Sequence, residues 1–394
     1  MVIKEVLTHP LHLTAVQSLS LDPLIVPAHN PIAILDDLER AISGQCSLLP
    51  LPEKDRARQA TLRASQRVGE PIADTALVMA TSGSTGTPKG AMLSPLNLVS
   101  SADATHQALG GPGQWHLALP AHHIAGIQVL VRSLIAGIEP THQDVSAGFN
   151  LDAFSTAASE LASTGDRSYT SLVPNQLLKA METLQGIEAL RLFDAILVGG
   201  APATRETLRA ARELGINVVT TYGSSETAGG CVYNGKPLPG ARVRTVGERI
   251  HLGGPMIASG YRNAPDHEAF AEPGWFATSD SGVLTEGVLR VTGRLDNVII
   301  TGGLKIHPEV VEEALLNVPG VTGACVVGVS DERLGQKIVA AYTGKATPGD
   351  VIEGLDELQR WQLPKQLLHL DELPLTGPGK VDRMKVTKLL TERK

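Results

Sequence analysis

The sequence has few aromatic residues and few cysteines, and neither sign of charge strongly predominates. Phe, Tyr and Trp make up 3% of its 394 residues, which disfavours a surface that stacks nucleic-acid bases. Lys and Arg number 34 against 41 Asp and Glu, a net charge of −7, so we expect no basic face for a nucleic acid. Cys46, Cys231 and Cys325 fit neither a disulfide framework nor a zinc spacing, which indicates a reducing, cytoplasmic compartment.

Long hydrophobic runs are lacking too. No window reaches the roughly 20 apolar residues of a transmembrane helix, and the amino terminus has no signal-peptide pattern. The most apolar helical segment, 124–138, is interrupted by Gln128, Arg132 and Ser133 and is expected to pack in a globular core. Neither membrane insertion nor a nucleic-acid partner is expected, and the oligomeric state, a homo-oligomer included, stays open.

From residue 76 onward, short apolar runs alternate with helix-like segments. This alternation favours an α/β fold with a parallel sheet between helices, in which ligands bind where strands end. Ser94 and Pro95 supply the N-cap and the first-turn proline of one helix. The expected strands are 76–80, 115–119, 169–173, 193–198 and 218–221, and the expected helices are 94–108, the segment after His123, 151–162, 174–184 and 203–214.

The pattern changes at about residue 241 to short β-like runs, which indicate an antiparallel β element at 243–246, 249–252 and 288–291. After residue 294 comes a compact set of about one hundred residues, enough for a small α+β domain. We therefore expect a large N-terminal domain, residues 1–294, with parallel sheets flanked by helices plus the antiparallel element. A small C-terminal domain, residues 295–394, follows it. Its expected elements are a helix after Pro308, strands at 324–329 and 338–342, and helices from about 349 and 382.

The densest chemical pattern is Thr81-Ser82-Gly83-Ser84-Thr85-Gly86-Thr87-Pro88-Lys89-Gly90, directly after a predicted strand. Its glycines let backbone amides turn toward an anion, its hydroxyls add donors, and Lys89 adds a positive charge, so the loop is suited to phosphates. It is not a Walker A loop, because Gly90 replaces the hydroxyl residue that follows the lysine there. The alternative is a polar surface turn.

This order of residues resembles the phosphate loop of the adenylate-forming superfamily of acyl-CoA synthetases, adenylation domains and luciferases. Further motifs resemble those of the superfamily in the same order along the chain, from about residue 70 to the end. Three positions depart from its patterns: Ser225 replaces a threonine, Ser279 a glycine and Asn297 an acid. The further motifs are Gly199-Gly200-Ala201-Pro202, Tyr222-Gly223-Ser224-Ser225-Glu226, Thr278-Ser279-Asp280, Gly293-Arg294-Leu295-Asp296 with Gly302-Gly303, and Pro374-Leu375-Thr376-Gly377-Pro378-Gly379-Lys380.

The resemblance implies a ligase that uses ATP and Mg²⁺ to convert a carboxylate into an acyl-adenylate and then passes the acyl group to CoA. Neutralising charge between an anionic acid and a triphosphate is the main task of such a site. The resemblance assigns Lys89 to phosphate, Glu226 to Mg²⁺ and Lys380 to the reacting carboxylate and α-phosphate. The implied nucleotide-binding residues are Thr81, Ser82, Gly83, Ser84, Thr85, Gly86, Gly200, Ala201, Tyr222, Gly223, Ser225, Asp280 and Arg294, with Asp280 at the ribose and Arg294 at the ribose or a phosphate.

A lysine on a loop flanked by Gly and Pro, far along the chain from the phosphate loop, is understandable if a mobile small domain delivers it. In the superfamily that domain rotates between two half-reactions about the position matched by Asp296, although an ordinary loop acid is the alternative there. The other pose would present the face at Gly302 and Gly303 to the pantetheine arm of CoA. Glycines at such a face permit close approach of the backbone.

The segment from Leu119 to Gly126 resembles the superfamily's LPLFHxxG segment, which assigns His123 to the acyl site. A metal is the poorer alternative, because adjacent histidines on a helix would point apart and no third ligand is near. Gln128 and Arg132 lie four residues apart and share a helix face with apolar neighbours. A guanidinium there is costly unless paired, and its partner is either a second carboxylate on the substrate or an internal Asp or Glu.

Residues 168–177 are similar to the branch of the superfamily that activates an aromatic dicarboxylate for menaquinone biosynthesis. The phosphate loop begins near residue 81, so we expect much of the superfamily's usual amino-terminal subdomain to be missing, which agrees with the short chains of that branch. Arg132 matches the aromatic-carboxylate contact of that branch. The expected reaction joins CoA to this acid and releases AMP and diphosphate. The alternatives are a CoA ligase for another short or aromatic acid, an adenylation module that loads a carrier protein, and a non-catalytic nucleotide-binding protein.

Overall fold

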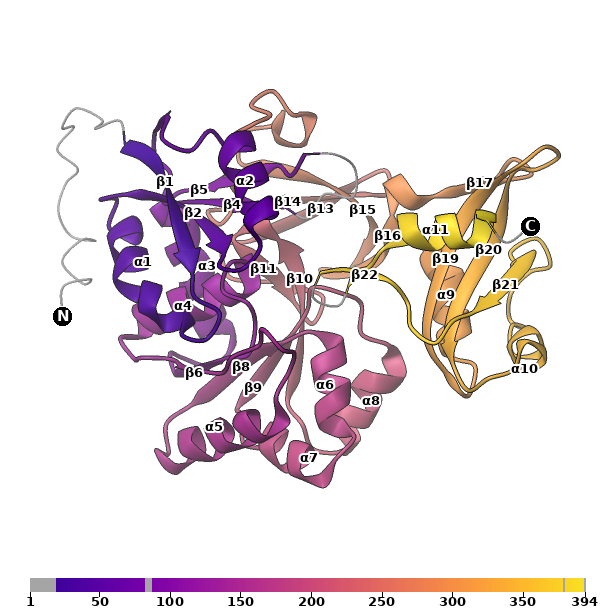
Figure 1. The fold of residues 1–394 in the computed structure, drawn as a ribbon, viewed down its shortest axis with the longest axis horizontal. Coiled ribbons are helices and arrows are strands. Elements are labelled where there is room, and N and C mark those ends of the chain that lie inside the picture. The colour runs from indigo at the N-terminus through magenta and orange to yellow at the C-terminus, as the bar shows by residue number, and fades with distance from the viewer. Residues whose placement is uncertain (1–18, 82–86, 378–379, 393–394) are drawn as a thin grey trace. The chain divides into compact units, whose positions relative to one another are not determined.

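The computed structural model describes residues 19–81, 87–377 and 380–392 (Figure 1). The chain divides into two compact units. The first comprises Met1–Gly200, Ala211–Val243 and Leu252–Ala277, and the second comprises Ala201–Ala210, Arg244–His251 and Thr278–Lys394. The domain bounds 1–294 and 295–394 stay a prediction.

A five-stranded sheet begins the first unit, with the order β3-β1-β2-β4-β5. β1, β2 and β4 are parallel, whereas β3 and β5 pair antiparallel with β1 and β4. Leu62 of the helix α2 packs in a buried cluster with Leu21, Leu49 and Val78. Of these strands the sequence pattern predicts only β4. The elements are β1 (Leu19–Val26), η1 (Pro31–Ile34), α1 (Leu35–Ile42), β2 (Ser47–Pro52), α2 (Arg56–Ser65), β3 (Pro71–Ile72), β4 (Leu77–Ala80) and β5 (Gly90–Leu93).

A seven-stranded sheet follows, with the order β12-β11-β10-β9-β8-β6-β7. The neighbouring strands β7, β6, β8, β9 and β10 are parallel to one another, and β11 and β12 add an antiparallel edge next to β10. Every residue of β8 and β9 is buried, which is typical of parallel strands covered on both faces. The strands are β6 (Gln114–Leu117), β7 (Thr141–His142), β8 (Ser168–Leu172), β9 (Ala195–Val198), β10 (Val218–Ser224), β11 (Gly229–Tyr233) and β12 (Lys236–Pro237).

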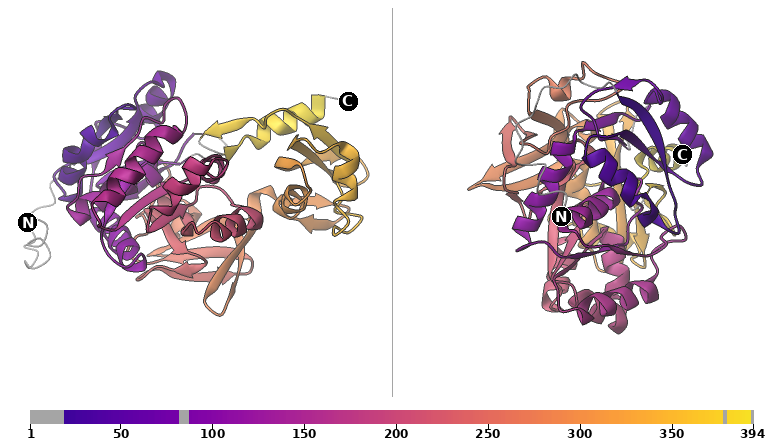
Figure 2. Two further views of the ribbon diagram at one scale, coloured as in Figure 1. Left: turned by 90° about the horizontal axis from the view of Figure 1, so that it is seen from below. Right: turned by 90° about the vertical axis from the view of Figure 1, so that its left-hand side faces the viewer.

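Capping side chains begin several helices of the first unit, and Figure 2 shows these helices, coloured indigo to magenta, from two further sides. Ser94 caps α3 through a capping box with Asn97, and Pro95 is its first residue. The single helix predicted at 174–184 is wrong: it ends at Met181, and the Thr183 hydroxyl accepts from the Gly186 amide to start another. The helices are α3 (Pro95–Ala108), α4 (Ile124–Ala136), α5 (Leu151–Ser163), α6 (Pro174–Met181), α7 (Leu184–Arg191) and α8 (Arg205–Glu213), the last crossing into the second unit.

A four-stranded sheet has the order β13-β14-β15-β16, and β15 pairs antiparallel with β16. The sequence pattern misses β15 because its apolar residues are broken by Ser279, Asp280 and Ser281. Within the described residues no helix is both long and apolar enough to cross a membrane. The strands are β13 (Arg242–Val246), β14 (Arg249–Gly253), β15 (Trp275–Thr285) and β16 (Val288–Arg294).

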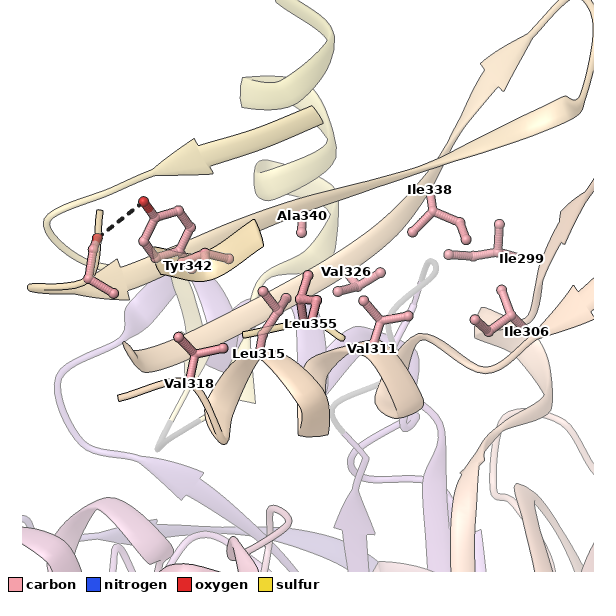
Figure 3. Close-up of a cluster of buried hydrophobic side chains, with 12 residues drawn as sticks. Ile299, Ile306, Val311, Leu315, Val318, Val326, Ile338, Ala340, Tyr342 and Leu355 are labelled. Atoms are coloured by element: carbon pink, nitrogen blue, oxygen red, sulfur yellow. Dashed lines mark hydrogen bonds between the residues drawn. The ribbon is translucent and has the colours of Figure 1, made fainter. Parts of the chain in front are cut away.

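The last hundred residues form a sheet of order β18-β17-β20-β19, with β21 added to β20. Successive residues of β19 point to opposite faces: Val326 packs with Leu315 of α9 (Figure 3), and Val327 packs with Val386 of α11. The predicted α+β set is thereby confirmed. Its elements are η4 (Leu295–Asn297), β17 (Ile299–Thr301), β18 (Leu304–Ile306), α9 (Pro308–Leu316), β19 (Val321–Asp331), β20 (Gly335–Gly344), α10 (Pro348–Glu353), β21 (Gln366–His369), β22 (Leu375–Gly377), β23 (Lys380–Val381) and α11 (Arg383–Glu392).

Candidate active site

The predicted phosphate loop joins β4 to β5. Thr81 and Lys89 lie at its two ends, where the Thr81 amide donates to the Lys89 carbonyl at 2.8 Å. The Pro88 carbonyl accepts from Gln66 Nε2 at 2.8 Å and from Asn263 Nδ2 at 3.0 Å, which fixes the backbone next to Lys89. The predicted ligands Ser82, Gly83, Ser84, Thr85 and Gly86 lie outside the described residues.

Glu226 lies in the short helix η2 (Ser225–Thr227), directly after β10. Its side chain is buried, and its Oε1 accepts a hydrogen bond of 2.6 Å from the Tyr261 hydroxyl. Burial and the neighbouring Glu226 carboxylate raise the pKa of Tyr261, so this hydroxyl keeps its proton and donates. Ala228 ends the turn at φ +49°, a left-handed conformation that is strained for alanine.

A single buried carboxylate suits Mg²⁺. Mg²⁺ usually takes one or two protein carboxylates and completes its shell with water and substrate phosphates. The described residues contain no group of three or more His, Cys, Asp or Glu side chains that could hold a metal by themselves. Glu226 is therefore a fitting protein ligand for Mg²⁺ bound together with a triphosphate.

Two of the predicted nucleotide-binding segments lie at the carboxyl ends of neighbouring strands. Gly200 follows β9 at φ +80°, with Ala201 directly after it, and Tyr222 and Gly223 are in β10, which pairs parallel with β9. A side chain at Gly223 would collide with the Gly229 carbonyl, because the β10–β11 ladder shifts register there. These strand ends are where α/β sheets bind ligands.

His123 and its neighbour differ from the expected geometry. His123 is the N-cap of α4 in an extended conformation, and its ring centroid lies 4.3 Å from that of His122. The premise that two helical histidines point apart is thus wrong, because the helix begins only at Ile124. Burial, and secondarily the charge of Arg58, lowers the pKa of His122 to about 4, which favours a neutral ring there.

Gln128 and Arg132 lie on one buried face of α4, as predicted. Gln128 Nε2 donates at 2.7 Å to the carbonyl of Ala228, the residue that closes the Glu226 turn, while its Oε1 has no hydrogen-bond partner in the described part of the chain. Arg132 is 3% exposed, and its Nη2 lies 3.5 Å from the Tyr233 hydroxyl.

Arg132 has no carboxylate partner among the described residues. Its Nε lacks any hydrogen-bond partner, and its guanidinium carbon lies 4.9 Å from the ring centroid of Trp115, a cation–π distance. Burial lowers the pKa of Arg132, while the neighbouring Tyr233 raises it. The structure therefore gives no support to the internal Asp or Glu that the sequence left open.

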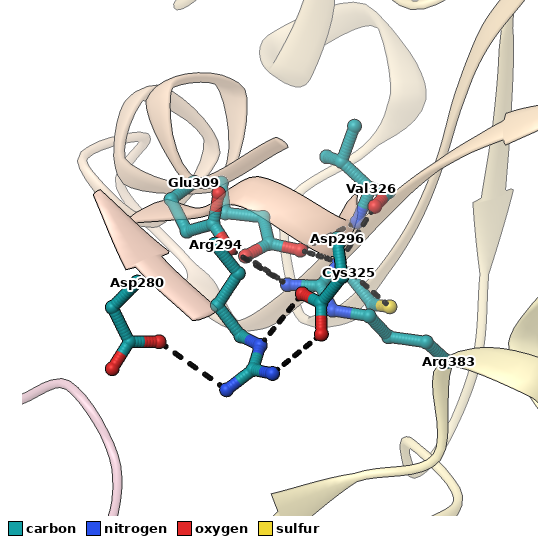
Figure 4. Close-up of polar contacts among 8 residues, drawn as sticks. Asp280, Arg294, Asp296, Glu309, Cys325, Val326 and Arg383 are labelled. Atoms are coloured by element: carbon teal, nitrogen blue, oxygen red, sulfur yellow. Dashed lines mark hydrogen bonds and ion pairs between the residues drawn. The ribbon is translucent and has the colours of Figure 1, made fainter. Parts of the chain in front are cut away.

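In the second unit one arginine connects two predicted site residues (Figure 4). Arg294 binds Asp296 through both carboxylate oxygens and donates from Nη1 to Asp280 Oδ1 at 3.2 Å. Gly302 at φ +57° and Gly303 at φ +81° form the turn of the β17–β18 hairpin.

Lys380 begins β23, where its backbone pairs with Gly377. Pro378 and Gly379 lie outside the described residues, as does the Lys380 side chain. The described backbone therefore places Lys380 on a two-stranded hairpin.

Comparison with known proteins decides the family. Residues 25–261 match the family AMP-binding enzyme, and residues 310–380 match the AMP-binding enzyme C-terminal domain. The chain belongs to the AMP-binding enzyme family. This confirms the predicted membership of the adenylate-forming superfamily.

Similar proteins cover most of this AMP-binding enzyme. It is 46% identical over 372 residues to a probable 2-succinylbenzoate–CoA ligase of Mycobacterium tuberculosis, with 91% of this chain and 96% of that protein covered. It is 30% identical to the 2-succinylbenzoate–CoA ligase of a Geobacillus species, with 90% and 77% covered. The o-succinylbenzoate coenzyme A synthetase of Bacillus subtilis, solved in complex with ATP and magnesium ion, has a TM-score of 0.72 at 25% identity, with 95% and 90% covered. The predicted fold class is confirmed.

Sequence reasoning missed the neighbours of the predicted residues in this AMP-binding enzyme. Tyr261 contacts Glu226, His267 contacts Lys89, and Tyr233 contacts Arg132. Each pair joins residues between 35 and 178 positions apart. The local sequence offers one weak signal, the rarity of tyrosine: the chain has five tyrosines, and two of them, Tyr233 and Tyr261, contact predicted site residues.

Proposed function

We propose that this protein is an AMP-forming ligase that joins CoA to 2-succinylbenzoate in menaquinone biosynthesis. ATP, 2-succinylbenzoate and CoA give 2-succinylbenzoyl-CoA, AMP and diphosphate through an acyl-adenylate. The observation that supports the choice of acid is the buried guanidinium of Arg132, which has no carboxylate partner among the described residues. The ligase names of the relatives in Mycobacterium and Geobacillus support the same acid.

The buried charge of Arg132, which meets no carboxylate in the part of the chain that the structure describes, has an energetic consequence. An uncompensated buried ion costs several kcal/mol, and an arginine can bind a carboxylate with two parallel hydrogen bonds. 2-Succinylbenzoate carries two carboxylates, one that reacts and one on the aromatic ring. We assign the ring carboxylate to Arg132, with Gln128 and His123 beside the acyl group.

The remaining roles follow the charge of the reaction. Lys89 and the phosphate loop bind the triphosphate, Glu226 holds Mg²⁺, and Lys380 offsets the charge of the attacking carboxylate and the α-phosphate. Bound Mg²⁺ supplies neutralisation of the phosphate oxygens. In the second unit, Asp280 and Arg294 bind the ribose.

The second half-reaction needs a thiol rather than a carboxylate at the adenylate. We propose that the C-terminal domain turns about Asp296 and brings the hairpin at Gly302 and Gly303 to the pantetheine arm. A glycine turn suits this role because the backbone approaches a narrow ligand without side chains in between. A cytoplasmic location, where ATP and CoA are available, belongs to the same proposal.

The test is replacement of Arg132 by leucine, with Arg56→Leu on the exposed face of α2 as the matched control. We expect kcat/KM for 2-succinylbenzoate to fall about 100-fold or more, because a site built to pair a polar group strongly rejects a mismatch. Activity on benzoate and short aliphatic acids should stay within a factor of two. The fold should keep or gain stability, because an apolar residue replaces a buried ion.

Unchanged selectivity of Arg132→Leu would instead support a ligase for another short or aromatic acid. A carrier-loading module would release pyrophosphate with the acid but would transfer the acyl group to a phosphopantetheinyl protein and not to free CoA. Measuring thioester formation with CoA and with such a carrier separates these two activities.

A further inference from the structure

Lys89 has a close neighbour that no motif predicts. Its Nζ lies 2.9 Å from Nε2 of His267, and it lies over the Tyr261 ring at 5.2 Å from the centroid. The rings of Tyr261 and His267 meet edge to face, with centroids 5.0 Å apart. The same tyrosine donates to Glu226, so one aromatic ring separates the lysine and histidine pair from the carboxylate assigned to Mg²⁺.

The other ring nitrogen of His267 shows where the proton of the imidazole lies. The backbone amide of Ala269 donates to His267 Nδ1 at 3.1 Å, so Nδ1 acts as the acceptor and carries no hydrogen. A neutral imidazole has one N–H, and it must then be on Nε2. His267 therefore points an N–H donor at the Lys89 amine.

An ammonium has three donors and no acceptor. Lys89 Nζ and His267 Nε2 are thus two donors side by side, and neither can accept from the other while the lysine is charged. Two adjacent donors, one of them positively charged, suit an anionic acceptor that lies beside both nitrogens. A phosphate oxygen satisfies both at once.

We propose that His267 is a phosphate ligand, whose Nε2–H acts with Lys89 to bind a terminal phosphate of ATP and, after displacement, pyrophosphate. The inference rests on the proposed ATP-dependent function and adds a residue to its phosphate site. Its position across the Tyr261 ring from Glu226 agrees, because Glu226 would hold the Mg²⁺ that offsets the charge of the same phosphates.

A neutral donor is an advantage at this position. Burial, and then the charge of Lys89, lowers the pKa of His267, so the ring adds a hydrogen bond without a second cation beside the lysine. Pyrophosphate is then held by one ammonium rather than two charges. The site can then stabilise pyrophosphate as it leaves and still release it afterwards.

The simpler role of His267 is to cap the short helix η3 (Glu268–Phe270) through Nδ1. Two substitutions separate that role from phosphate binding. His267→Asn keeps an acceptor near the Nδ1 position and removes the distal donor, whereas His267→Gln reaches the Nε2 position with an N–H. Exposed His29→Asn is the matched control.

The experiment measures binding of pyrophosphate, ATP and AMP to the full chain by titration calorimetry, with and without Mg²⁺, together with the KM for ATP. We expect His267→Asn to weaken pyrophosphate and ATP binding about tenfold, because a hydrogen bond to a charged group is lost. AMP binding should not change, since AMP lacks the terminal phosphates. His267→Gln should recover most of the lost affinity.

Unchanged pyrophosphate affinity in His267→Asn, or equal losses for AMP and pyrophosphate, would overturn the inference. Lys89→Met distinguishes this from failure of the proposed function. If Lys89→Met weakens pyrophosphate binding and His267→Asn does not, only the role of His267 is wrong. If the unsubstituted chain binds neither ATP nor pyrophosphate, the proposed function is wrong as well.

Discussion

Arg294 holds Asp296 with two parallel hydrogen bonds, from Nε to Oδ1 at 2.9 Å and from Nη2 to Oδ2 at 2.5 Å. Its third donor group reaches Asp280 at 3.2 Å. The pKa of Arg294 is raised, first by the hydrogen bonds to Asp296. The proposed hinge residue and the proposed ribose ligand therefore share one guanidinium.

Asp296→Ala should raise the KM for ATP about fivefold. Without Asp296 the guanidinium keeps its ion pair with Asp280 and competes with the ribose hydroxyls for that carboxylate. The groups are partly exposed, so the effect is modest. Pyrophosphate release at varied ATP measures it, with exposed Glu357→Ala as control. An unchanged KM would show that Asp296 does not restrain Arg294.

Local chemistry made part of the fold predictable. Ser94 and Pro95 begin α3 through contacts within three residues, so the sequence pattern predicts that helix correctly. The break after Met181 depends on Thr183, which caps α7. A single threonine within a stretch of helix-forming residues is weak evidence for a helix boundary. β15 was missed because it alternates irregularly around Asp280, and its pairing with β16 decides its conformation.

The positions of site residues could be predicted where motif order along the chain determines them, as for Glu226 directly after β10. It was not predictable where distant segments meet. Nothing local shows that Tyr261 donates to Glu226 or that Arg132 meets no acid among the described residues, because both depend on which side chains the packed core brings together.

Arg383→Ala should lower the free energy of unfolding by about 3 kcal/mol, because it leaves a largely buried glutamate unpaired. Arg383 Nη1 donates to the Val326 carbonyl at 2.7 Å (Figure 4). The guanidinium also pairs with Glu312 at 2.7 Å, so Arg383 joins α11 to β19 and α9. Chemical unfolding followed by fluorescence measures the change. Lys385→Ala, at a side chain 67% exposed, is the control, and equal effects of the two would contradict the prediction.

Lowering the pH should destabilise the fold through His116. Burial lowers its pKa to about 4, so between pH 6.5 and 4 the unfolded chain binds a proton that the folded chain does not. This contribution to stability is present above pH 6.5 and is lost as the pH falls toward 4. When the pH falls from 6.5 to 5, the free energy of unfolding should decrease by about 1 to 2 kcal/mol less in His116→Gln than in the unsubstituted protein.

Unfolding free energies measured at several pH values test this, and the comparison between variants cancels the titration of other groups. Exposed His29→Gln should leave the pH dependence unchanged. Parallel curves for His116→Gln and the unsubstituted protein would show that His116 is not held neutral.

Lys380→Ala should separate the two half-reactions. If Lys380 offsets charge only while the carboxylate attacks ATP, its loss should slow adenylation about 100- to 1,000-fold, while a supplied acyl-adenylate still reacts with CoA. Pyrophosphate release measures the first step, and thioester formation from synthetic acyl-adenylate measures the second. Lys388→Ala, at an exposed lysine of the following helix that pairs with Glu392, is the matched control. Equal damage to both steps would mean that Lys380 acts in folding or domain placement and not at the reacting carboxylate.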